Sequence, residues 1–543
     1  MLRHAVFFLM ITSLGWANGP HVQPRIKKEE YKQRRAKLIE TLSDQPLVLM
    51  GNVLRTRSND TDYEFKQEPN FYYLTGINEP GAYLIVSKRP FTWKGKQVHE
   101  LVFVQENNPI NEIWNGKRLG VAGVSRELGL ENVSPAEGRE GLSRVNLFEN
   151  FMKTFAKENP VFHLHTPLIH ADRFGVRESY TEMYTRSLLE ALQAHDLEVP
   201  ELENPGRIEV LDPVLLKNAM AGLRGIKSED ELALLQKAVD ISIAGHHQSL
   251  RIASHVEHEY QVEAAIEYAF HFHGAEAQGY NSIVGCGANG TILHYMTNRD
   301  KIDPSSIFCL DAGAEYQGYT ADITRSFPAD GTFTTEQRAI YEIVWAGQLA
   351  GAKEFRPGST YDRVHAAIKQ EMAKGLVKLG LIKTERVEMR LDALGGHAGR
   401  NYVFAEDVRQ GDETLAEAGF GLKPAVLERL TLAGITTVTL RDMSQLQQLF
   451  PHGWGHPIGL DVHDPSRDIP FEKGMVWTIE PGIYIADRID FPIPEGYMNI
   501  GIRIEDMYLI TADGNRCLSE KLPRDPDQIE AIMKQKSTIL PTQ

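Results

Sequence analysis

Three histidines lie close together in a stretch of the chain that is otherwise rich in glycine and proline. The stretch reads PHGWGHPIGLDVHDP and carries His452, His456 and His463, although the whole chain has 19 histidines in 543 residues. Histidine binds metals and transfers protons near neutral pH, so either chemistry would explain the cluster. His452 and His456 have the spacing of a helical zinc motif, but Pro457 disfavours helical geometry at the residue before it. Because the glutamate of that motif is also missing, we exclude a helical zinc site.

Two aspartates, Asp311 and Asp322, lie on the arms of an expected hairpin with the sequence LDAGAEYQGYTAD. A turn centred on Tyr316 and Gln317 would place the aspartates directly opposite each other, with Cβ atoms about 4.5 to 5.5 Å apart. Two acids held that close repel each other and need a cation or a shared proton. A solvated polar face is the alternative. Both aspartates lie among apolar strand residues, however, so we favour a metal.

Two glutamates have similar settings. Glu480 ends the apolar strand GMVWTI and precedes Pro-Gly, and Glu505 lies in GIRIEDMYLIT, where apolar neighbours indicate burial. A buried carboxylate is unfavourable unless it is paired or coordinated. For Glu505 the simplest alternative is a salt bridge to Arg503, which lies two residues away on the same face of the strand. Four carboxylates on strands, together with a glycine-flanked histidine, favour a metal centre.

The first part of the chain predicts an α/β domain over residues 20–225. The segment RIKKEEYKQRRAKLIETL is typical of an amphipathic helix. Short apolar segments then predict strands: PLVLMGN, FYYLTGI, AYLIVSK, HELVFVQ and NPVFHLH. Strands alternating with helical segments such as RSLLEALQAHDL indicate the α/β class.

A second domain is predicted over residues 226–532. Its first helix begins with Ser228 as N-cap and Glu231 three residues later, which is a capping box. His246 and His247 come late on this helix, where an exposed face is favoured over a ligand role. The later segments predict one helix, EQRAIYEIVWAGQLAGAKEF, and strands in NSIVGCG, SIFCLDAGAEYQGYTADITRSFP, GMVWTIEPGIYIA and NIGIRIEDMYLIT. Residues 384–448, with the helical-looking KPAVLERLTLAG, form an insertion to which we assign no chemistry.

Composition excludes some classes of function. The formal net charge of −15 argues against nucleic acid as a partner, because phosphate binding needs a basic surface. The hydrophobic fraction of 42% with 24% charged residues describes a folded, soluble protein of at least two domains. The three cysteines are widely spaced and contain no CxxC, so they predict neither a disulfide framework nor a zinc knuckle.

The N-terminal residues 1–19 have the features of a signal peptide. A short basic start precedes an apolar run, and Gly15-Trp16-Ala17 offers small residues for cleavage. The apolar run is too short to span a bilayer, and no later stretch is apolar enough to do so. We therefore expect export, to a periplasm or outside the cell, if the signal is used, and a cytoplasmic protein otherwise.

Several motifs taken together resemble the pita-bread metallopeptidases, in the branch of aminopeptidase P (Xaa-Pro aminopeptidase). They are LDAGAEYQGYTADITRSFP, HGWGHPIGLDVHD, TIEPGIYIA, GIRIEDMYLIT and the upstream YNSIVGCGANGTILHY. FYYLTGINEPGAYLIV and EIWNGKRLG also look like the N-terminal domain of that branch. The resemblance implies an α/β (α+β) protein, with an N-terminal domain of the creatinase/prolidase type and a C-terminal pita-bread domain.

The resemblance also implies two divalent metal ions held by five side chains. These are Asp311, Asp322, His456, Glu480 and Glu505. Asp322 and Glu505 would bridge both ions, Asp311 would complete one site, and His456 with Glu480 would complete the other. Mostly hard oxygen ligands with one imidazole suit manganese best, with cobalt, iron or zinc as alternatives.

The implied reaction releases the N-terminal residue of a peptide that has proline in second position. A hydroxide shared by the two ions would attack, with Glu480 as its proton acceptor. His294 and His463 would stabilise the oxyanion or pass a proton to the leaving nitrogen, and His452 would line the substrate pocket. Arg503 would orient the carboxylates. The resemblance further implies a homo-oligomer, either a dimer or a tetramer.

Three alternatives remain open at this point. A prolidase, which cuts only Xaa-Pro dipeptides, would use the same ligands. A methionine aminopeptidase is disfavoured by the large N-terminal domain. A metal-free creatinase-like hydrolase, or a peptide-binding protein that has lost catalysis, is disfavoured because all five ligand types are present.

Overall fold

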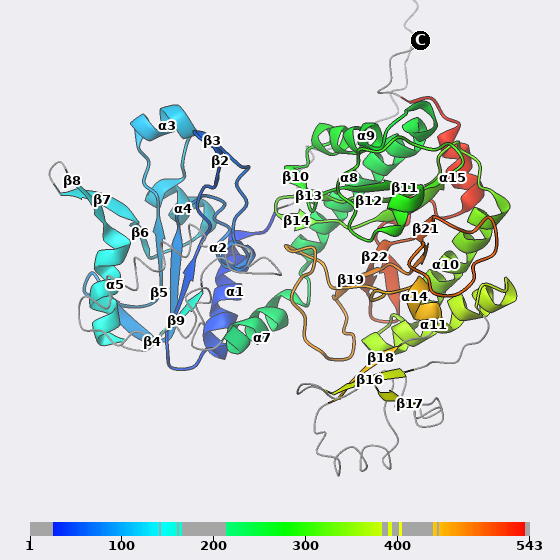
Figure 1. The fold of residues 1–543 in the computed structure, drawn as a ribbon. Coiled ribbons are helices and arrows are strands. Elements are labelled where there is room, and N and C mark those ends of the chain that lie inside the picture. Colours follow the sequence, from blue (N-terminus) through cyan, green and yellow to red (C-terminus); the bar gives the residue numbers. More distant parts are fainter. Residues whose placement is uncertain are drawn as a thin grey trace, which may run out of the picture.

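The computed structural model describes residues 25–140, 143–159, 162–165, 213–382, 389–393, 401–403, 438–442 and 445–537. Figure 1 shows two bodies side by side, an N-terminal body in blue to cyan and a C-terminal body in green to red. Helix α7 (Pro213–Arg224) leads from the first body to the second. The expected signal peptide and the segments RSLLEALQAHDL and KPAVLERLTLAG lie outside the described residues.

A mixed sheet in the order β6-β5-β4-β1-β9 forms the centre of the N-terminal body. Its strands are β1 (Leu47–Met50), β4 (Tyr83–Trp93), β5 (Lys96–Val104), β6 (Val133–Pro135) and β9 (His163–His165). Alternate residues of β1 pack into two different cores, because successive side chains of a strand point to opposite faces. The cores are closed by α1 (Lys28–Thr41) on one face and α5 (Leu147–Glu158) on the other (Figure 1).

The segment FYYLTGI is a helix, so the prediction of a strand there was wrong. Helix α2 (Pro69–Thr75) has Pro69 in its first turn, and Glu68 caps it by accepting a hydrogen bond from the Phe71 amide at 2.6 Å. It ends at Gly76, whose φ of 71° is left-handed. Proline at the start and glycine after the end are signals of a helix, and they outweigh the strand propensity of the aromatic residues.

The N-terminal body also has several smaller elements. They are the hairpins β2 (Thr56–Ser58) with β3 (Thr61–Asp62) and β7 (Glu137–Glu140) with β8 (Ser143–Asn146), and the helices α3 (Pro109–Asn115) and α4 (Gly120–Leu128).

Two pairs of long helices cover the strands of the C-terminal body (Figure 1). The pairs are α8 (Glu229–Ile252) with α9 (Glu259–Phe272), and α10 (Thr335–Glu354) with α11 (Tyr361–Lys378). The predicted capping box is confirmed: the Ser228 side chain accepts from the Glu231 amide, and the Glu231 side chain accepts from the Ser228 amide. No helix of the described ranges is long and apolar enough to cross a membrane.

The strands between these helices form small antiparallel sheets. They are β10 (Ala277–Gln278), β11 (Ile283–Cys286), β12 (Ile307–Asp311), β13 (Ala314–Tyr316), β14 (Tyr319–Thr320), β15 (Thr324–Pro328), β19 (Val476–Ile479), β20 (Gly482–Ile485), β21 (Ile500–Arg503), β22 (Asp506–Ile510) and β23 (Asn515–Cys517). The pairings are β11-β12-β15, β10-β13-β14, β19-β22-β23 and β20-β21. The strands predicted from NSIVGCG to NIGIRIEDMYLIT are therefore confirmed.

The remaining elements are short. They are the 3₁₀ turns η1 (Ala253–His255) and η2 (Gly287–Thr291), and the helices α14 (Gln445–Leu449) and α15 (Pro526–Met533). Of the expected insertion, the structure describes β16 (Met389–Ala393), β17 (Asn401–Val403) and β18 (Val438–Asp442), which pair in the order β17-β16-β18.

The predicted register of the aspartate hairpin was wrong by one turn position. The turn is formed by Gln317 and Gly318, with φ values of 48° and 79°. Two positive φ values are typical of a type I′ turn, whose twist suits a tight hairpin. As a result Asp311 pairs with Thr324, and Asp322 lies two residues before that pairing position.

Candidate metal centre

Each of the four predicted carboxylate ligands lies where a strand ends or breaks. Asp311 ends β12, Asp322 lies in the gap between β14 and β15, and Glu480 follows β19. Glu505 lies between β21 and β22, and His456 lies in the histidine loop (residues 451–465) between α14 and β19. All five line one cleft of about 530 Å³. The other residues singled out from the sequence, His294, His452, His463 and Arg503, line the same cleft.

The histidine loop is attached to β19, and this attachment brings His456 next to Glu480. The Thr478 amide donates to the His456 carbonyl at 2.9 Å, and the His456 amide donates to the Thr478 hydroxyl at 3.1 Å. Gly455 is required here, because a Cβ at this position would lie 2.1 Å from the Thr478 carbonyl oxygen. The Glu480 amide completes the attachment with a 2.8 Å bond to the Trp454 carbonyl.

His456 lies at the centre of the acidic residues. Its Nε2 is 3.4 Å from Asp322 Oδ2 and 3.4 Å from Glu480 Oε1. Three potential ligand atoms lie within 4.8 Å of one another, one each from Asp322, His456 and Glu505. These distances would let one cation contact several of the side chains.

Asp311 and Asp322 are joined by Tyr280, a residue that we did not single out from the sequence. The Tyr280 hydroxyl makes a short hydrogen bond to Asp311 and lies 2.6 Å from Asp322 Oδ1. Burial, followed by the charges of the two aspartates, raises the pKa of Tyr280 well above its usual value. The tyrosine therefore stays neutral and can donate to one of the carboxylates at a time.

Arg503 pairs with Asp311, whereas the sequence suggested a salt bridge to Glu505. Its guanidinium donates to Asp311 Oδ2 at 2.7 Å and to the Tyr484 hydroxyl at 2.8 Å. It also donates from Nε to the Thr324 hydroxyl at 3.1 Å. A salt bridge to Arg503 therefore does not explain the burial of Glu505, because the ion pair of Arg503 is with Asp311.

Glu505 is left with one unsatisfied oxygen. Thr324 donates to its Oε2 at 2.7 Å, but the buried Oε1 has no hydrogen-bond partner among the described residues. A buried acceptor without a partner is costly. A metal ion would satisfy this oxygen, so the residues present fit such an ion.

The charge balance of the cleft supports the same fit. Burial raises the pKa of Glu480 to about 7. Burial, together with the charge of Asp322, raises the pKa of Asp311 to about 6. The pKa of Glu505 is raised well above its usual value by burial and by the neighbouring carboxylates. Burial opposes a charge on His456, but Asp322 and Glu480 raise the pKa of its imidazole to about 9. Without a metal the acids resist ionising together, which is the setting that a divalent cation relieves.

The other cleft histidines are neutral or exposed. Burial, together with the charge of Arg503, lowers the pKa of His452 to about 3, and its Nε2 lies 2.8 Å from the Tyr484 hydroxyl. His463 is exposed at the cleft, but partial desolvation and the charge of His456 lower its pKa. Its ring centroid is 4.2 Å from that of His456. His294 is exposed at the cleft. Neutral imidazoles can donate a hydrogen bond or accept a proton.

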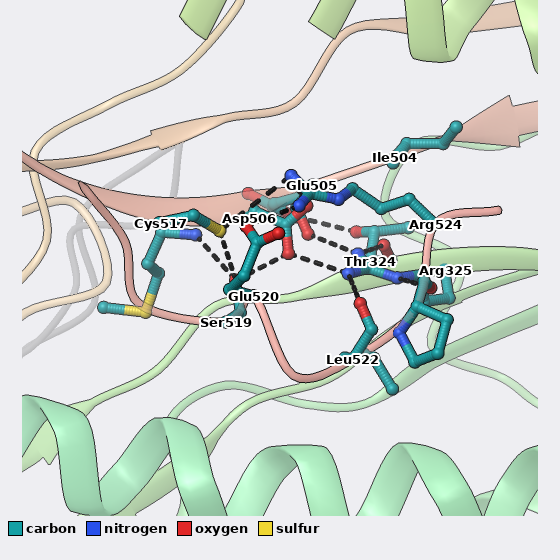
Figure 2. A network of polar contacts seen from close by, with 12 residues as sticks. Thr324, Arg325, Ile504, Glu505, Asp506, Cys517, Ser519, Glu520, Leu522 and Arg524 are labelled. Atoms are coloured by element: carbon teal, nitrogen blue, oxygen red, sulfur yellow. Dashed lines mark hydrogen bonds and ion pairs between the residues drawn. The ribbon is translucent and has the colours of Figure 1, made fainter. Parts of the chain in front are cut away.

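A buried ion pair fixes the backbone behind Glu505 (Figure 2). Arg325 donates to the Glu505 carbonyl at 2.8 Å and to the Thr324 carbonyl at 2.9 Å. It also pairs with Asp506 at 2.7 Å, and Ser519 donates to the same Asp506 oxygen at 2.5 Å. The two segments that carry Thr324 and Glu505 are therefore held by one guanidinium.

His246 is buried, so the prediction of an exposed face was wrong for this residue. Its side chain comes from α8, and its Nε2 lies 3.0 Å from the Ala312 carbonyl oxygen. Burial lowers the pKa of this histidine to about 3, so it is neutral and donates from Nε2. It supports the backbone next to Asp311, whereas its neighbour His247 is half-buried.

The chain is similar to known proteins along most of its length. Residues 233–512 match the metallopeptidase family M24, and residues 31–143 match the N-terminal domain of aminopeptidase P. The chain is 31% identical to an Xaa-Pro aminopeptidase of Escherichia coli K12, over 94% of this chain and 98% of that protein.

Solved structures show the same similarity. The proline aminopeptidase P II of Yersinia pestis superposes with a TM-score of 0.68 at 30% identity, over 94% of this chain and 99% of that one. Zinc-substituted E. coli aminopeptidase P in complex with product gives a TM-score of 0.68 at 29% identity, over 94% and 98% of the two chains. The similarity therefore covers both bodies of the fold.

Proposed function

The chain belongs to the metallopeptidase family M24, and we propose that it is an Xaa-Pro aminopeptidase, which releases the N-terminal residue from peptides with proline in second position. The observation that carries the proposal is the convergence of five acidic and imidazole side chains in one cleft, within a chain that also matches the N-terminal domain of aminopeptidase P.

We propose that Asp311, Asp322, His456, Glu480 and Glu505 hold two divalent metal ions. The unsatisfied Glu505 oxygen and the clustered carboxylates support this assignment. Manganese is the proposed metal, because most of the oxygen donors are hard ligands and there is only one imidazole among the five. When bound, such ions act as Lewis acids and activate water near neutral pH.

The remaining cleft residues would bind and orient the peptide. Glu480 lines the cleft beside His456, where it would accept the proton of the attacking water. His463 and His294 would donate to the developing oxyanion or to the leaving nitrogen, and His452 would line the pocket. Arg503 would hold Asp311 in one orientation through its 2.7 Å ion pair.

The metal-centred site suits a prolyl bond. The nitrogen of an Xaa-Pro peptide bond belongs to proline and carries no hydrogen, so an enzyme cannot bind it through an N–H group. Attack on the carbonyl of the preceding residue needs no such contact. The proposal therefore explains why a cleft built from carboxylates and imidazoles would act on this bond.

A reconstituted assay tests the proposal. The metal-depleted full chain is supplied with Mn²⁺ and given Ala-Pro-Gly, Ala-Ala-Gly and the dipeptide Ala-Pro, and released alanine is identified by mass spectrometry. We expect alanine from Ala-Pro-Gly only when metal is present, and far less from Ala-Ala-Gly.

Two results would contradict the proposal in different ways. Cleavage of Ala-Pro alone would identify a prolidase. Unchanged cleavage by Asp322→Ala, together with the absence of bound metal in the wild type, would show that the chemistry does not use a metal.

Export and self-association are further parts of the proposal. The residues 1–19 support export, and N-terminal sequencing of the protein from its native source would detect removal of the leader. The resemblance to aminopeptidase P supports a dimer or tetramer, which sedimentation of the full chain would measure.

A further inference from the structure

Three buried charged side chains form a cluster at the junction of the two bodies, outside the metal centre. Arg224 ends α7, Lys227 follows it in the link to α8, and Asp464 lies in the histidine loop. Their side chains are 2%, 1% and 1% exposed. Lys227 donates to Asp464 Oδ2 at 2.8 Å, and Arg224 makes a short hydrogen bond to Oδ1 of the same carboxylate.

This cluster connects the N-terminal body to the histidine loop. Arg224 also donates to the Asn70 side chain of α2 at 2.8 Å and to Asp461 Oδ2 at 2.7 Å. Tyr73 of α2 donates to the carbonyl of Leu223, the residue before Arg224, at 2.8 Å. In Figure 1 the orange segment that includes this loop lies on the side of the C-terminal body that faces the N-terminal body.

Inside the loop, the anchored carboxylates bracket His463. The Asp461 amide donates to Asp464 Oδ1 at 3.2 Å, and the Asp464 amide donates to the Pro457 carbonyl at 2.9 Å. Gly459 is in close contact with the Asp464 carboxylate, since a Cβ there would lie 2.8 Å from its Cγ. His463 therefore lies in a short, closed turn whose two ends are held by the same arginine.

Stability alone does not explain such a cluster. Removing charged groups from water is expensive, and well-packed apolar residues of similar size are often equally stable. Directional ion pairs do provide a fixed geometry, and a misplacement of about 1 Å can cost a catalytic group roughly 100-fold in rate. The cluster sets the position of the loop, and the loop carries His463 into the cleft beside His456.

We propose that Asp464, held by Arg224 and Lys227, is a positioning residue for His463, so that contact with the N-terminal body sets the geometry of the catalytic cleft. This inference rests on the proposed function of His463. It assigns the N-terminal body a role in catalysis through the bonds from α2 to Arg224 and Leu223.

The test compares Asp464→Asn with a matched control, Asp240→Asn, in the full chain. Asp240 forms an exposed ion pair with Lys521 at 3.7 Å in the same body and has no contact with the cleft. We expect Asp464→Asn to lower kcat on Ala-Pro-Gly about tenfold or more, with KM changed by less than about threefold and metal content unchanged. Asp240→Asn should behave as the wild type.

A double variant separates positioning from a general structural effect. If Asp464 acts through His463, Asp464→Asn should cause no further loss of kcat in a His463→Ala background. Independent, multiplicative losses in the double variant would overturn the proposal. So would a wild-type kcat in Asp464→Asn, or a loss of metal in place of the loss of turnover.

A second variant and a spectroscopic measurement keep the test decisive. If Asp464→Asn does not fold, Asp461→Asn replaces it, since the Asp461 side chain is 40% exposed. About a threefold loss of kcat is then expected, and an unchanged kcat would refute the proposal.

The ¹³Cε1 NMR signal of His463, assigned by its loss in His463→Ala, reports the position of the ring directly. It should shift in whichever aspartate variant is used and stay in place in Asp240→Asn. This signal needs no activity, so an inactive wild type would refute the proposed function, whereas an unmoved signal would refute the positioning role.

Discussion

The imidazole of His246 and the carbonyl of Ala312 are joined by a 3.0 Å hydrogen bond between α8 and the end of β12. Ala312 directly follows Asp311, and its amide donates at 3.2 Å to the carbonyl of Ile323, which directly follows Asp322. One imidazole thus supports the backbone next to both aspartates. Because a side chain is aimed by its backbone, the proposed metal site depends on a helix that contributes no ligand to it.

Replacing His246 by leucine should weaken metal binding. The Ala312 carbonyl would lose its donor, and loss of a group that orients metal ligands typically costs about 10- to 100-fold in metal affinity. Glutamine can place an N–H near the position of the histidine Nε2, so His246→Gln should bind Mn²⁺ much more tightly than His246→Leu. Titration calorimetry with Mn²⁺ measures both.

The neighbouring residue provides the control for this prediction. His247→Leu changes the same helix at a half-buried residue and should keep the affinity of the wild type. Equal affinities of His246→Leu and the wild type would show that the aspartates do not depend on this hydrogen bond.

The same histidine should make stability depend on pH. Burial lowers the pKa of His246 to about 3 in the folded protein, whereas an unfolded histidine has a pKa of about 6.5. Between these values the unfolded chain binds more protons, so the free energy of unfolding falls as the pH falls from about 6.5 towards 3. The loss is at most about 1.4 kcal/mol per pH unit.

His246→Gln removes this titrating group. Urea unfolding of the metal-free protein between pH 4 and pH 7 should therefore show a shallower pH dependence in the variant than in the wild type. Identical slopes would mean that His246 is already charged, or already exposed, in the folded protein.

Thr324 should be required for the orientation of Glu505 and Arg503. Its hydroxyl donates to Glu505 at 2.7 Å and accepts from Arg503 at 3.1 Å. Valine has the same shape without the hydroxyl, so Thr324→Val should lower the free energy of unfolding by about 1–3 kcal/mol and weaken Mn²⁺ binding. Thr324→Ser keeps the hydroxyl and should restore most of both. A Thr324→Val variant that binds Mn²⁺ as the wild type does would contradict the prediction.

The sequence predicted which side chains would meet, but not how they are held. Carboxylates at strand ends and a histidine between a glycine and a proline are local patterns, so Asp311, Glu480 and His456 could be identified from the sequence. Tyr280 and Thr324 could not, because their partners lie 31 to 181 residues away in the chain and neither residue has a distinctive neighbourhood. Arg503 had a sequence neighbour of opposite charge, but its ion pair is with Asp311, which folding brings to it from 192 residues away.

The errors in the fold have local causes. Aromatic residues favour strands, and in FYYLTGI they concealed the proline and glycine that bound α2. The hairpin turn was placed one residue early, because Gln317 adopts a left-handed φ of 48° that is uncommon outside glycine, asparagine and aspartate. His246 was assigned to an exposed face because the helical pattern cannot show that α8 is covered by a strand on that side.

The two histidines whose rings lie 4.2 Å apart should have separable roles. His456 is 3.4 Å from both Asp322 and Glu480, so His456→Ala should lose Mn²⁺ affinity by about tenfold or more and lose turnover with it. Among the described residues, His463 forms no hydrogen bond or ion pair with a carboxylate of the cleft. His463→Ala should therefore keep its metal and lose kcat by roughly 10²- to 10⁴-fold, as expected for a proton donor. Metal analysis and kinetics on the same preparations measure both effects. Loss of metal from His463→Ala, or full metal content in His456→Ala, would mean that the two roles have been assigned to the wrong residues.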